Sequence, residues 1–567
     1  MPDVTPELPA TYYLDNFCHL LSQVWDLYDD LLSDDERSFC RDFFQLSTAA
    51  QCLYVRLLGR RGDWFRSDRL EYREIDDIPA ALRELASQRF IQLVLPTSEL
   101  ARTTCHEWVS LFTRPELVAV LGRGNLSGCP KEQLVTLVCD EVAEGNLLLT
   151  TLTDDPIVCV YGEQELDTLR LLFFGNLHQN LTDFVLRDLG IYRYVEYEIS
   201  TSTRWCQTRA QLERHAQLFA LWPDELWFRQ ASVNDLVSLA ASLPEAGDDR
   251  ILRRRSDRLL NQTGRQLERL SASTEALAIY AKSTHHPARE RTLRLLVQVG
   301  QTDQAETYAS EMAAAPWCEE ELQFLMSFVP RKLKDAVTLC ESLNQSRHQP
   351  QSDLLVLPAD ISRTELGVER ATAEALAREY PGDNLFYCEN LLIPGMFGLI
   401  FWDAVFAPLE GAFFHPFQIR PADLYDEDFS DKRQSLMTRC WQSLADSDTL
   451  LNAALGAFER YHGLANPFVH WGFLSKELLT LAVRSIPVEH WQKCFEFMLR
   501  DLRHHRAGLP DLIRFCEDGS YELIEVKGPG DTLQKNQKAW LQAFDRAGIP
   551  ARVLLVRDAP DPDDHAA

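Results

Sequence analysis

The sequence predicts a multidomain fold that is mostly α-helical in its N-terminal and middle regions and ends in an α/β domain. At 567 residues the chain exceeds the ~250–300 residues that one hydrophobic core can serve. Apolar residues recur at helical spacing through the N-terminal and middle regions. Runs with strand-like alternation are concentrated near the C-terminal end, at 512–515, 521–527 and 551–557. Helical domains are therefore expected to precede a domain that contains a sheet.

Changes in pattern divide the chain into segments of different expected character. They are a helical region at 1–100, a short helical module at 101–160, a helical linker region at 161–250, a domain of paired helices at 251–364, the α/β domain at 365–557 and a disordered acidic tail at 558–567. The stretch QPQSDLLVLPADISRT, at 349–364, is the best candidate for an interdomain linker.

Composition narrows the class of protein. No apolar run approaches the ~18 residues of a membrane span, and the first residues lack the pattern of a secretion signal. The 14 cysteines form no C-x-x-C pair, which argues against a zinc ribbon. We expect an intracellular protein, cytoplasmic and nucleoid-associated if bacterial and nuclear if eukaryotic. The net charge of −28 means that any nucleic acid must be held by local clusters of Lys and Arg.

A basic and aromatic cluster ends the first helical pattern. Its candidate DNA-contact residues are Arg56, Arg60, Arg61, Trp64 and Arg66. Guanidinium groups bind backbone phosphates and aromatic rings stack on bases, so this composition suits a DNA contact. A solvated helix face is an equally good interpretation.

The segment 105–145 has two short helical patterns separated by a glycine-rich turn at 122–128. It resembles the SAP module, a helix-turn-helix DNA binder, and Arg123 and Lys131 are its candidate phosphate contacts. A plain helical hairpin is nearly as good an interpretation.

Short helical patterns alternate with breaks over 274–345, with alanines at tight-packing spacing. They resemble tetratricopeptide-type helical pairs, although no clean repeat period is present. Such pairs commonly bind protein partners, so the segment 251–364 is a candidate protein-binding domain.

A constellation near the C-terminal end carries the strongest chemical signal. Pro510-Asp511 precedes one strand-like run, Glu525-Val526-Lys527 ends the next, and Glu517-Asp518-Gly519 forms the turn between them. With a three-residue turn that places Gly in the left-handed conformation, the predicted antiparallel partners are Asp511 with Glu525, Ile513 with Leu523, Arg514 with Glu522 and Phe515 with Tyr521. The alternative two-residue turn would put Asp511 and Glu525 on opposite faces and break the Arg514–Glu522 pair.

In the favoured register Asp511, Glu525 and Lys527 share one face of the hairpin. Two carboxylates and the Val526 carbonyl would hold Mg²⁺ or Mn²⁺, as one ion or two, and Lys527 would polarise a water or neutralise developing charge. The candidate DNA contacts Lys535 and Lys538 lie on the helix expected after the Gly528–Asp531 turn. A surface ion pair is the alternative for an isolated E-x-K. Coupled to Pro510-Asp511, the pattern predicts metal-dependent phosphodiester hydrolysis.

GLPDLIRF followed by ELIEVKGPGDTLQKNQKAWL closely resembles the VRR-NUC domain of the PD-D/E-x-K nuclease superfamily. The stretches 51–72, 189–199 and 397–425 are similar to the Fanconi-associated nuclease family. The resemblance implies a structure-specific endonuclease that cuts 5′ flap and branched DNA, with 5′-to-3′ exonuclease capacity, in interstrand-crosslink repair. It also implies that Asp511, Glu525 and Val526 bind metal and that Lys527 is catalytic.

The same resemblance points to two residues far upstream of the hairpin. Glu389, in FYCEN, matches a helix-borne metal-binding Glu of the family, and Gln418, in HPFQIRPAD, matches an active-site Gln. Eukaryotic members carry a ubiquitin-binding zinc finger, for which this sequence has no suitable Cys/His spacing, so a bacterial member is the simpler interpretation. The alternatives are a helical scaffold with a degenerate nuclease module and a junction-resolving or restriction-type nuclease.

Overall fold

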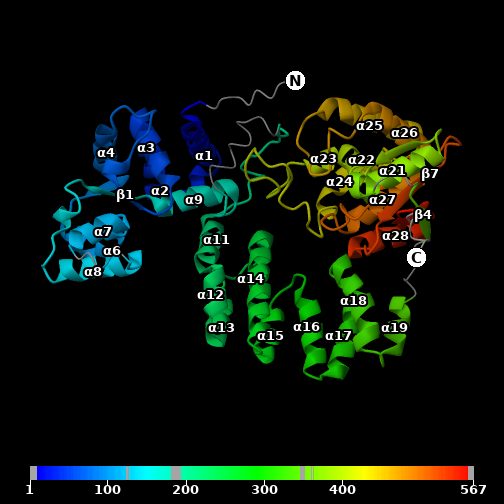
Figure 1. Ribbon diagram of the computed structural model, residues 1–567, viewed down its shortest axis with the longest axis horizontal. Coiled ribbons are helices and arrows are strands. Elements are labelled where there is room, and N and C mark those ends of the chain that lie inside the picture. The colour runs from blue at the N-terminus through cyan, green and yellow to red at the C-terminus, as the bar shows by residue number, and fades with distance from the viewer. Residues whose placement is uncertain are drawn as a thin grey trace, which may run out of the picture. The chain divides into compact units, whose positions relative to one another are not determined.

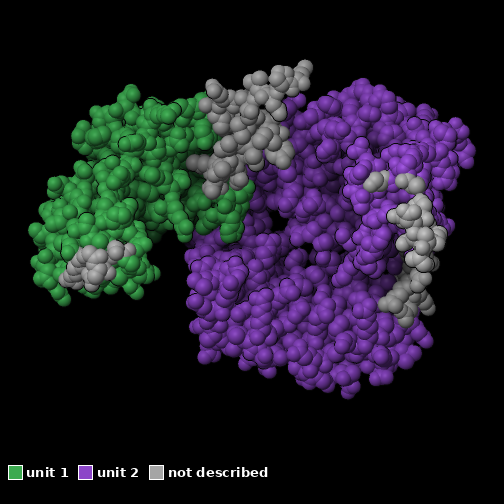
Figure 2. Space-filling view, viewed as in Figure 1, with its two compact units in different colours: residues 1–192, 206–212 green, residues 193–205, 213–567 purple. Residues whose placement is uncertain are grey.

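The computed structural model of the chain describes residues 9–122, 126, 128–179, 193–344, 351–358, 360–361 and 363–559 (Figure 1). The chain divides into two compact units, residues 1–192 with 206–212 and residues 193–205 with 213–567 (Figure 2). Helices predominate over the described residues, and each unit contains a small sheet. The predicted fold class is confirmed.

The first unit combines a helical layer with a three-stranded sheet of order β1-β3-β2. The helices are α1 (Tyr12–Tyr28), α2 (Asp34–Gln45), α3 (Thr48–Leu58), α4 (Ile78–Ser87) and α9 (Glu163–Phe174), and the strands are β1 (Trp64–Arg66), β2 (Ile91–Val94) and β3 (Ile157–Val160). The sequence did not predict this sheet, because none of its three short strands shows an alternation clear enough to stand out from the surrounding helical patterns. The segments 1–100 and 101–160 share it, since β3 pairs with both β1 and β2.

Between β2 and β3 lies a bundle of short helices around the buried Trp108. They are α5 (Glu99–Thr103), α6 (Cys105–Val109), α7 (Arg114–Leu121) and α8 (Lys131–Ala143). The two helices predicted within 105–145 are α7 and α8. Helix α7 ends at Gly122, whose φ of 62° favours glycine. Arg123 lies outside the described residues.

An array of helices begins at residue 209, belongs to the second unit from residue 213 onward and includes the predicted helical pairs (Figure 1). Its members are α11 (Arg209–Leu221), α12 (Glu225–Gln230), α13 (Val233–Ser242), α14 (Arg250–Arg269), α15 (Ser273–Tyr280), α16 (Ala288–Gln298), α17 (Thr302–Ala314), α18 (Glu319–Lys332) and α19 (Val337–Asn344). Helices α14 and α15 approach closely at Gly264, where a Cβ atom would lie 2.6 Å from the Tyr280 ring. No described helix has the length and apolarity needed to cross a membrane.

The α/β domain is built on a five-stranded sheet of order β4-β8-β7-β6-β5. The strands are β4 (Ser352–Val356), β5 (Asn384–Tyr387), β6 (Leu512–Phe515), β7 (Tyr521–Lys527) and β8 (Ala551–Arg557). The three strands predicted from sequence are confirmed, with the predicted bounds. The prediction of a linker at 349–364 is wrong where β4 lies, because SDLLV pairs in parallel with β8. Residues 345–350, 359 and 362 of this region and 560–567 of the predicted tail are outside the described residues.

Helices cover both faces of this sheet. Helices α20 (Arg363–Leu366) and α21 (Val368–Glu379) pack on one face, with Leu512, Ile524 and Val526 beneath them. The other face packs against α28 (Lys535–Ala547) and the helical insertion between β5 and β6. The insertion contains α22 (Leu392–Ile400), α23 (Trp402–Val405), α24 (Gln434–Gln442), α25 (Ser447–Tyr461), α26 (Lys476–Ser485) and α27 (Val488–Arg500).

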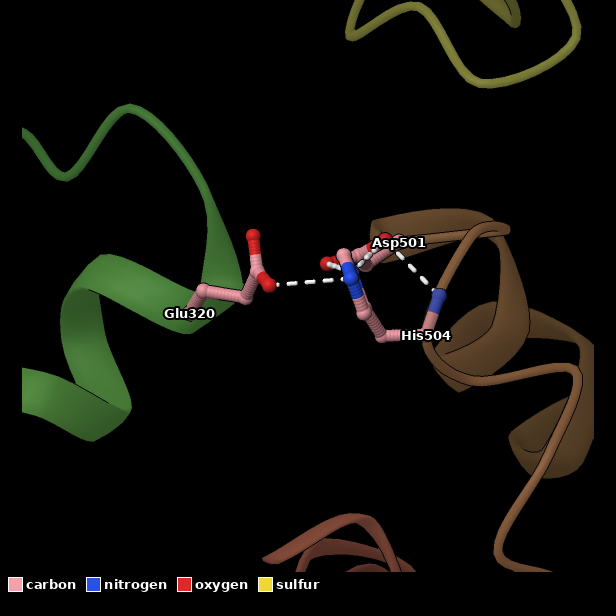
Figure 3. Close-up of side chains that lie close together, drawn as sticks. All are labelled: Glu320, Asp501 and His504. Atoms are coloured by element: carbon pink, nitrogen blue, oxygen red, sulfur yellow. Dashed lines mark hydrogen bonds and ion pairs between the residues drawn. The ribbon is translucent and has the colours of Figure 1, made fainter. Parts of the chain in front are cut away.

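Two ion pairs of His504 connect the helical array to the α/β domain within the second unit (Figure 3). His504 Nε2 lies 2.9 Å from Glu320 Oε1, at the start of α18, and His504 Nδ1 lies 2.9 Å from Asp501 Oδ2, just after α27. Hydrogen bonds to the two carboxylates raise the pKa of His504 to about 9. These three side chains have the chemistry of a metal site, but the ring is protonated at neutral pH and already joins the two carboxylates.

Replacing His504 by Gln is expected to remove a pH-dependent part of the stability. The folded-state pKa of about 9 lies above the unfolded value of ~6.5, so the contribution is complete below pH ~6.5 and is lost as pH rises through about 9. The thermal unfolding midpoint of the wild type should therefore fall more steeply between pH 6 and 10 than that of His504→Gln. The exposed His470→Gln is the control. Equal pH slopes in the wild type and His504→Gln would contradict the assignment.

Candidate active site

The β6–β7 hairpin has the predicted register. Ile513 pairs with Leu523, Arg514 with Glu522 and Phe515 with Tyr521. The turn is Glu517-Asp518-Gly519, and Gly519 has a φ of 84°. Arg514 Nη2 lies 3.1 Å from Glu522 Oε2, as the cross-strand charge pairing predicted. The alternative two-residue turn is thereby excluded.

This register brings Asp511 and Glu525 to the same end of the hairpin. Asp511 is 7% exposed, and its Oδ2 accepts a hydrogen bond of 2.8 Å from the Val526 backbone N–H. Glu525 is 1% exposed, and Lys527 Nζ lies 2.8 Å from its Oε1. The Val526 side chain packs in the core on the opposite face, so this residue can offer the site only its backbone. The hairpin therefore presents two carboxylates and one ammonium in a nearly dry setting.

Burial changes the protonation of both carboxyl groups. Burial, reinforced by the charge of Glu389, raises the pKa of Asp511 to about 6 despite the Val526 hydrogen bond. Burial and the charge of Asp511 raise the pKa of Glu525 to about 7, against the opposing effect of Lys527. Crowded acids of this kind are stabilised in their ionised form by a nearby cation. The donor set therefore fits a divalent metal ion, which prefers carboxylate oxygens.

Glu389 joins this pair through strand β5. Strand β5 pairs antiparallel with β6, and Cys388 N donates to the Asp511 carbonyl at 2.8 Å. Glu389 is the next residue, and its charge acts on Asp511 and on Glu525. The expectation of a helix-borne Glu is wrong here: Glu389 lies in the turn between β5 and α22, where the Tyr387 hydroxyl donates to its Oε2.

Asn390 is a site-building residue that the sequence did not reveal. It has a φ of 55°, in the left-handed region that non-glycine residues rarely adopt. Its Oδ1 accepts from Leu509 N at 3.1 Å, and its Nδ2 donates to Glu389 Oε1 at 3.2 Å. The Asn390 side chain therefore connects the turn that carries Glu389 to the segment that precedes Asp511.

Replacing Asn390 by Gly is expected to weaken metal binding more than it slows the reaction at saturating metal. Glycine keeps the left-handed backbone but removes both side-chain hydrogen bonds, so Glu389 loses its orientation. Loss of such supporting contacts typically costs ~10–100-fold in metal affinity. The measurement is the Mn²⁺ concentration that gives half-maximal DNA cleavage. The control is Asn384→Ala, a substitution at an exposed residue of β5. An unchanged Mn²⁺ requirement would show that Asn390 does not position Glu389.

Gln418 occupies a loop position that the sequence could not define. Its Oε1 accepts from the backbone N–H groups of Phe414 and His415, and its own N–H donates to the Tyr197 hydroxyl at 2.9 Å. Among the contacts of the described residues, none joins Gln418 to Asp511 or Glu525. The carboxamide closes a turn in this structure, and its active-site role stays a prediction.

Two predicted DNA contacts of the first unit are engaged in internal ion pairs. Arg56 Nη2 lies 2.6 Å from Glu74, and Arg66 contacts Asp68 and Glu116 at 2.6 and 2.7 Å with a side chain only 10% exposed. A phosphate would have to compete with these carboxylates, and the roles of both arginines stay predictions.

The other predicted DNA contacts differ in their surroundings. Trp64 packs against the core around Trp108, and Lys131 Nζ donates to the Ser110 carbonyl at 2.7 Å. The remaining cations are exposed, at the end of α3 and at the start of α28: Arg60, Arg61, Lys535 and Lys538. Their DNA roles are untested predictions, but their side chains are accessible.

An arginine cluster around Tyr425 was missed by the sequence reasoning. The guanidinium carbons of Arg420, Arg503 and Arg506 lie 4.6, 5.4 and 5.6 Å from the centre of the Tyr425 ring. All three arginines are exposed, and none has an acidic partner among the ion pairs of the described residues. The signal was the run RDLRHHR shortly before Asp511, although nothing local showed that Arg420 joins it.

Known proteins resemble this chain over most of its length. The VRR-NUC domain model matches residues 447–558, and the model of the FAN1 HTH domain matches 11–92. The Fanconi-associated nuclease 1 homolog of Pseudomonas aeruginosa is 36% identical over 98% of each chain. Human Fanconi-associated nuclease 1 is 23% identical, over 96% of this chain and 62% of its own. The crystal structure of "paFAN1 bound to 2nt 5'flap DNA with gap" matches with a TM-score of 0.78 at 35% identity, covering 98% of this chain and 100% of that one.

These matches agree with the chemistry of the site. The VRR-NUC match covers the hairpin that carries Asp511, Glu525 and Lys527, and it indicates a nuclease that depends on a divalent metal ion. Because the similarity to the Pseudomonas protein extends over nearly all of both chains, this nuclease belongs to the Fanconi-associated nuclease family.

Proposed function

We propose that the protein is a structure-specific endonuclease that cuts 5′ flap and branched DNA, with 5′-to-3′ exonuclease capacity, in interstrand-crosslink repair. The observation that carries the chemistry is the buried group of Asp511 and Glu525 with Lys527 beside them. The substrate class is supported by the similar structure that was determined with 5′ flap DNA.

In the proposed reaction each residue has a distinct task. Asp511, Glu525 and Glu389, together with the Val526 carbonyl, would hold Mg²⁺ or Mn²⁺, as one ion or two. Such an ion, when bound, would supply positive charge to the phosphate and would make a water easier to deprotonate. Lys527, held by Glu525, orients the attacking water or neutralises the charge that develops on the phosphate. Burial of the carboxylates keeps competing bulk water from the ligands.

The proposed DNA interface uses local cations, because the protein as a whole has a net charge of −28. The cluster of Arg420, Arg503 and Arg506 combines exposed guanidinium groups with a sequence position just before Asp511. Unpaired arginines bind phosphate well, since their donors match its oxygens. Lys535 and Lys538, on the helix α28 that follows β7 in the sequence, supply two further exposed positive charges.

Two further proposals rest on the sequence. The helical array from α14 to α19 is a candidate surface for protein partners, because tetratricopeptide-like pairs commonly serve that purpose. We place the protein in the cytoplasm, in association with the nucleoid, if the source is bacterial.

The test is cleavage of end-labelled 5′ flap DNA with Mn²⁺, with Mg²⁺ and with a chelator, beside nicked duplex, intact duplex and a four-way junction. The proposal expects metal-dependent cuts that are mapped close to the flap junction and are fastest on the flap. Absence of hydrolysis with either metal would favour the scaffold alternative. Symmetric paired cuts in the junction, or cuts at one sequence in intact duplex, would favour a resolving or restriction-type nuclease.

A further inference from the structure

A strip of exposed apolar side chains lies at one end of the five-stranded sheet. Leu354 and Val356 of the edge strand β4 are 56% and 49% exposed, and Leu555 of the neighbouring strand β8 is 43% exposed. We call these three residues the apolar strip. Edge strands are usually protected by charge, so an accessible aliphatic group here requires an explanation.

The strand register places the apolar strip beside the catalytic hairpin. Leu555 pairs with Lys527 on one side and with Leu354 on the other, in parallel ladders. Paired residues in a ladder project from the same face, so Lys527, Leu555 and Leu354 form one row across three strands. Two residues earlier on the same face, Glu525 pairs with Val553 of β8, which is buried. The strip therefore starts where the covered part of this face ends.

One cation borders the strip. Arg557 pairs with Val356 in the same ladder and is exposed. It has no acidic partner among the ion pairs of the described residues, whereas Arg552 of the same strand is paired with Asp353 and Glu522. The surface next to Lys527 therefore combines aliphatic contact area with one exposed guanidinium. A nucleotide offers the matching chemistry, since the two faces of its base are flat and apolar and its phosphate is anionic.

We propose that the apolar strip holds a nucleotide of the cleaved strand next to the scissile phosphate. Leu555 and Leu354 contact its base, and Arg557 binds the adjoining phosphate. This inference rests on the proposed function, because Lys527 places the reacting phosphate beside the strip. The contact keeps the strand in line with the attacking water, and it does not depend on base identity, because aliphatic groups form no base-specific hydrogen bonds.

The double variant Leu354→Thr/Leu555→Thr tests the base contact, since threonine is β-branched and favours strands and both positions are exposed. The matched control is Leu226→Thr/Val237→Thr, two exposed aliphatic residues of α12 and α13, outside the α14–α19 array. We expect kcat/KM on 5′ flap DNA to fall about tenfold in the strip variant and to stay unchanged in the control.

Abasic substrates show whether the loss comes from the base. Flaps carry one abasic site at a time on either side of the cut, and we expect one position to slow the wild type by a similar factor. At that position the strip variant should show no further loss. Arg557→Gln should instead lose affinity on every substrate, with a weaker dependence on salt.

Three outcomes would overturn the inference. They are a wild-type rate in the strip variant, an equal loss on intact and all abasic substrates, and an equal loss in the control variant. A wild-type protein that cuts no flap DNA would overturn the proposed function itself, and that result is visible before any variant is compared.

Discussion

Asp511→Asn is expected to lower the single-turnover rate on 5′ flap DNA by about a thousandfold or more. The substitution preserves shape, and the Asn oxygen can still accept the Val526 N–H that now bonds Oδ2 at 2.8 Å. It removes one of the buried negative charges that attract the metal. Loss of a single charge-stabilising group at the reacting centre typically costs ~10²–10³ in rate, and here metal binding is lost in addition. The measurement is cleavage of labelled flap DNA over a range of Mn²⁺ concentrations.

The same substitution is expected to stabilise the metal-free protein. The folded-state pKa of Asp511, about 6, lies above the unfolded value of ~3.9. The ionised carboxylate therefore costs stability as pH rises above ~4, and the full cost is present above about 6. At pH 8 metal-free Asp511→Asn should unfold at a higher temperature than metal-free wild type, and Mn²⁺ should raise the unfolding temperature of the wild type far more.

Asp518→Asn, in the exposed turn of the same hairpin, is the matched control for both measurements. It should leave cleavage and the Mn²⁺-induced shift unchanged. An Asp511→Asn protein that cut flap DNA at the wild-type rate would refute the catalytic assignment. A lower unfolding temperature in the absence of metal would show that the carboxylate is structural.

Lys527→Met is expected to reduce the rate at saturating Mn²⁺ by about 100- to 1000-fold while DNA binding changes little. The substitution keeps the aliphatic stem and removes the ammonium that lies 2.8 Å from Glu525 Oε1. Loss of one donor aimed at developing charge costs rates of this order. The three carboxylates remain, so Mn²⁺ should still shift the unfolding temperature, which distinguishes this variant from Asp511→Asn.

Lys535→Met is the control for charge, because Lys535 is exposed at the start of α28 and outside the carboxylate group. It should weaken DNA binding without lowering the rate at saturating DNA. The measurements are flap affinity by fluorescence anisotropy with Ca²⁺ and single-turnover cleavage with Mn²⁺. A Lys527→Met enzyme within a few-fold of the wild-type rate would remove Lys527 from the mechanism.

The hairpin that carries Asp511 and Glu525 could be predicted from sequence because its signals are local. The bounds of β6, β7 and β8 follow from short alternating runs, and the register follows from one glycine turn and one charge pair, Arg514 with Glu522. The spacing of Asp511, Glu525 and Lys527 along two adjacent strands was therefore sufficient to place them together. Glu389 and Gln418 came only from family resemblance.

Tertiary structure decided the features whose partners lie far apart in the chain. Strand β5 brings Glu389 to Asp511, and Asn390 connects the two segments, although neither residue has a local pattern that marks it. The sequence reasoning took strand β4 for a linker. This exposed edge strand has only five residues, and it is a strand because it pairs with β8, which no local pattern indicates.

The tertiary structure also decided which arginines form ion pairs with carboxylates. Arg56 and Arg66 looked like free DNA contacts in the sequence, but folding brings Glu74 and Glu116 to them, while Arg420 joins Arg503 and Arg506 around Tyr425. The sequence by itself determined the local chemistry of the hairpin and the class of fold. Only the tertiary structure decided which of the described cations remain exposed and which distant carboxylate lies beside the hairpin, because both depend on contacts between segments that no local pattern specifies.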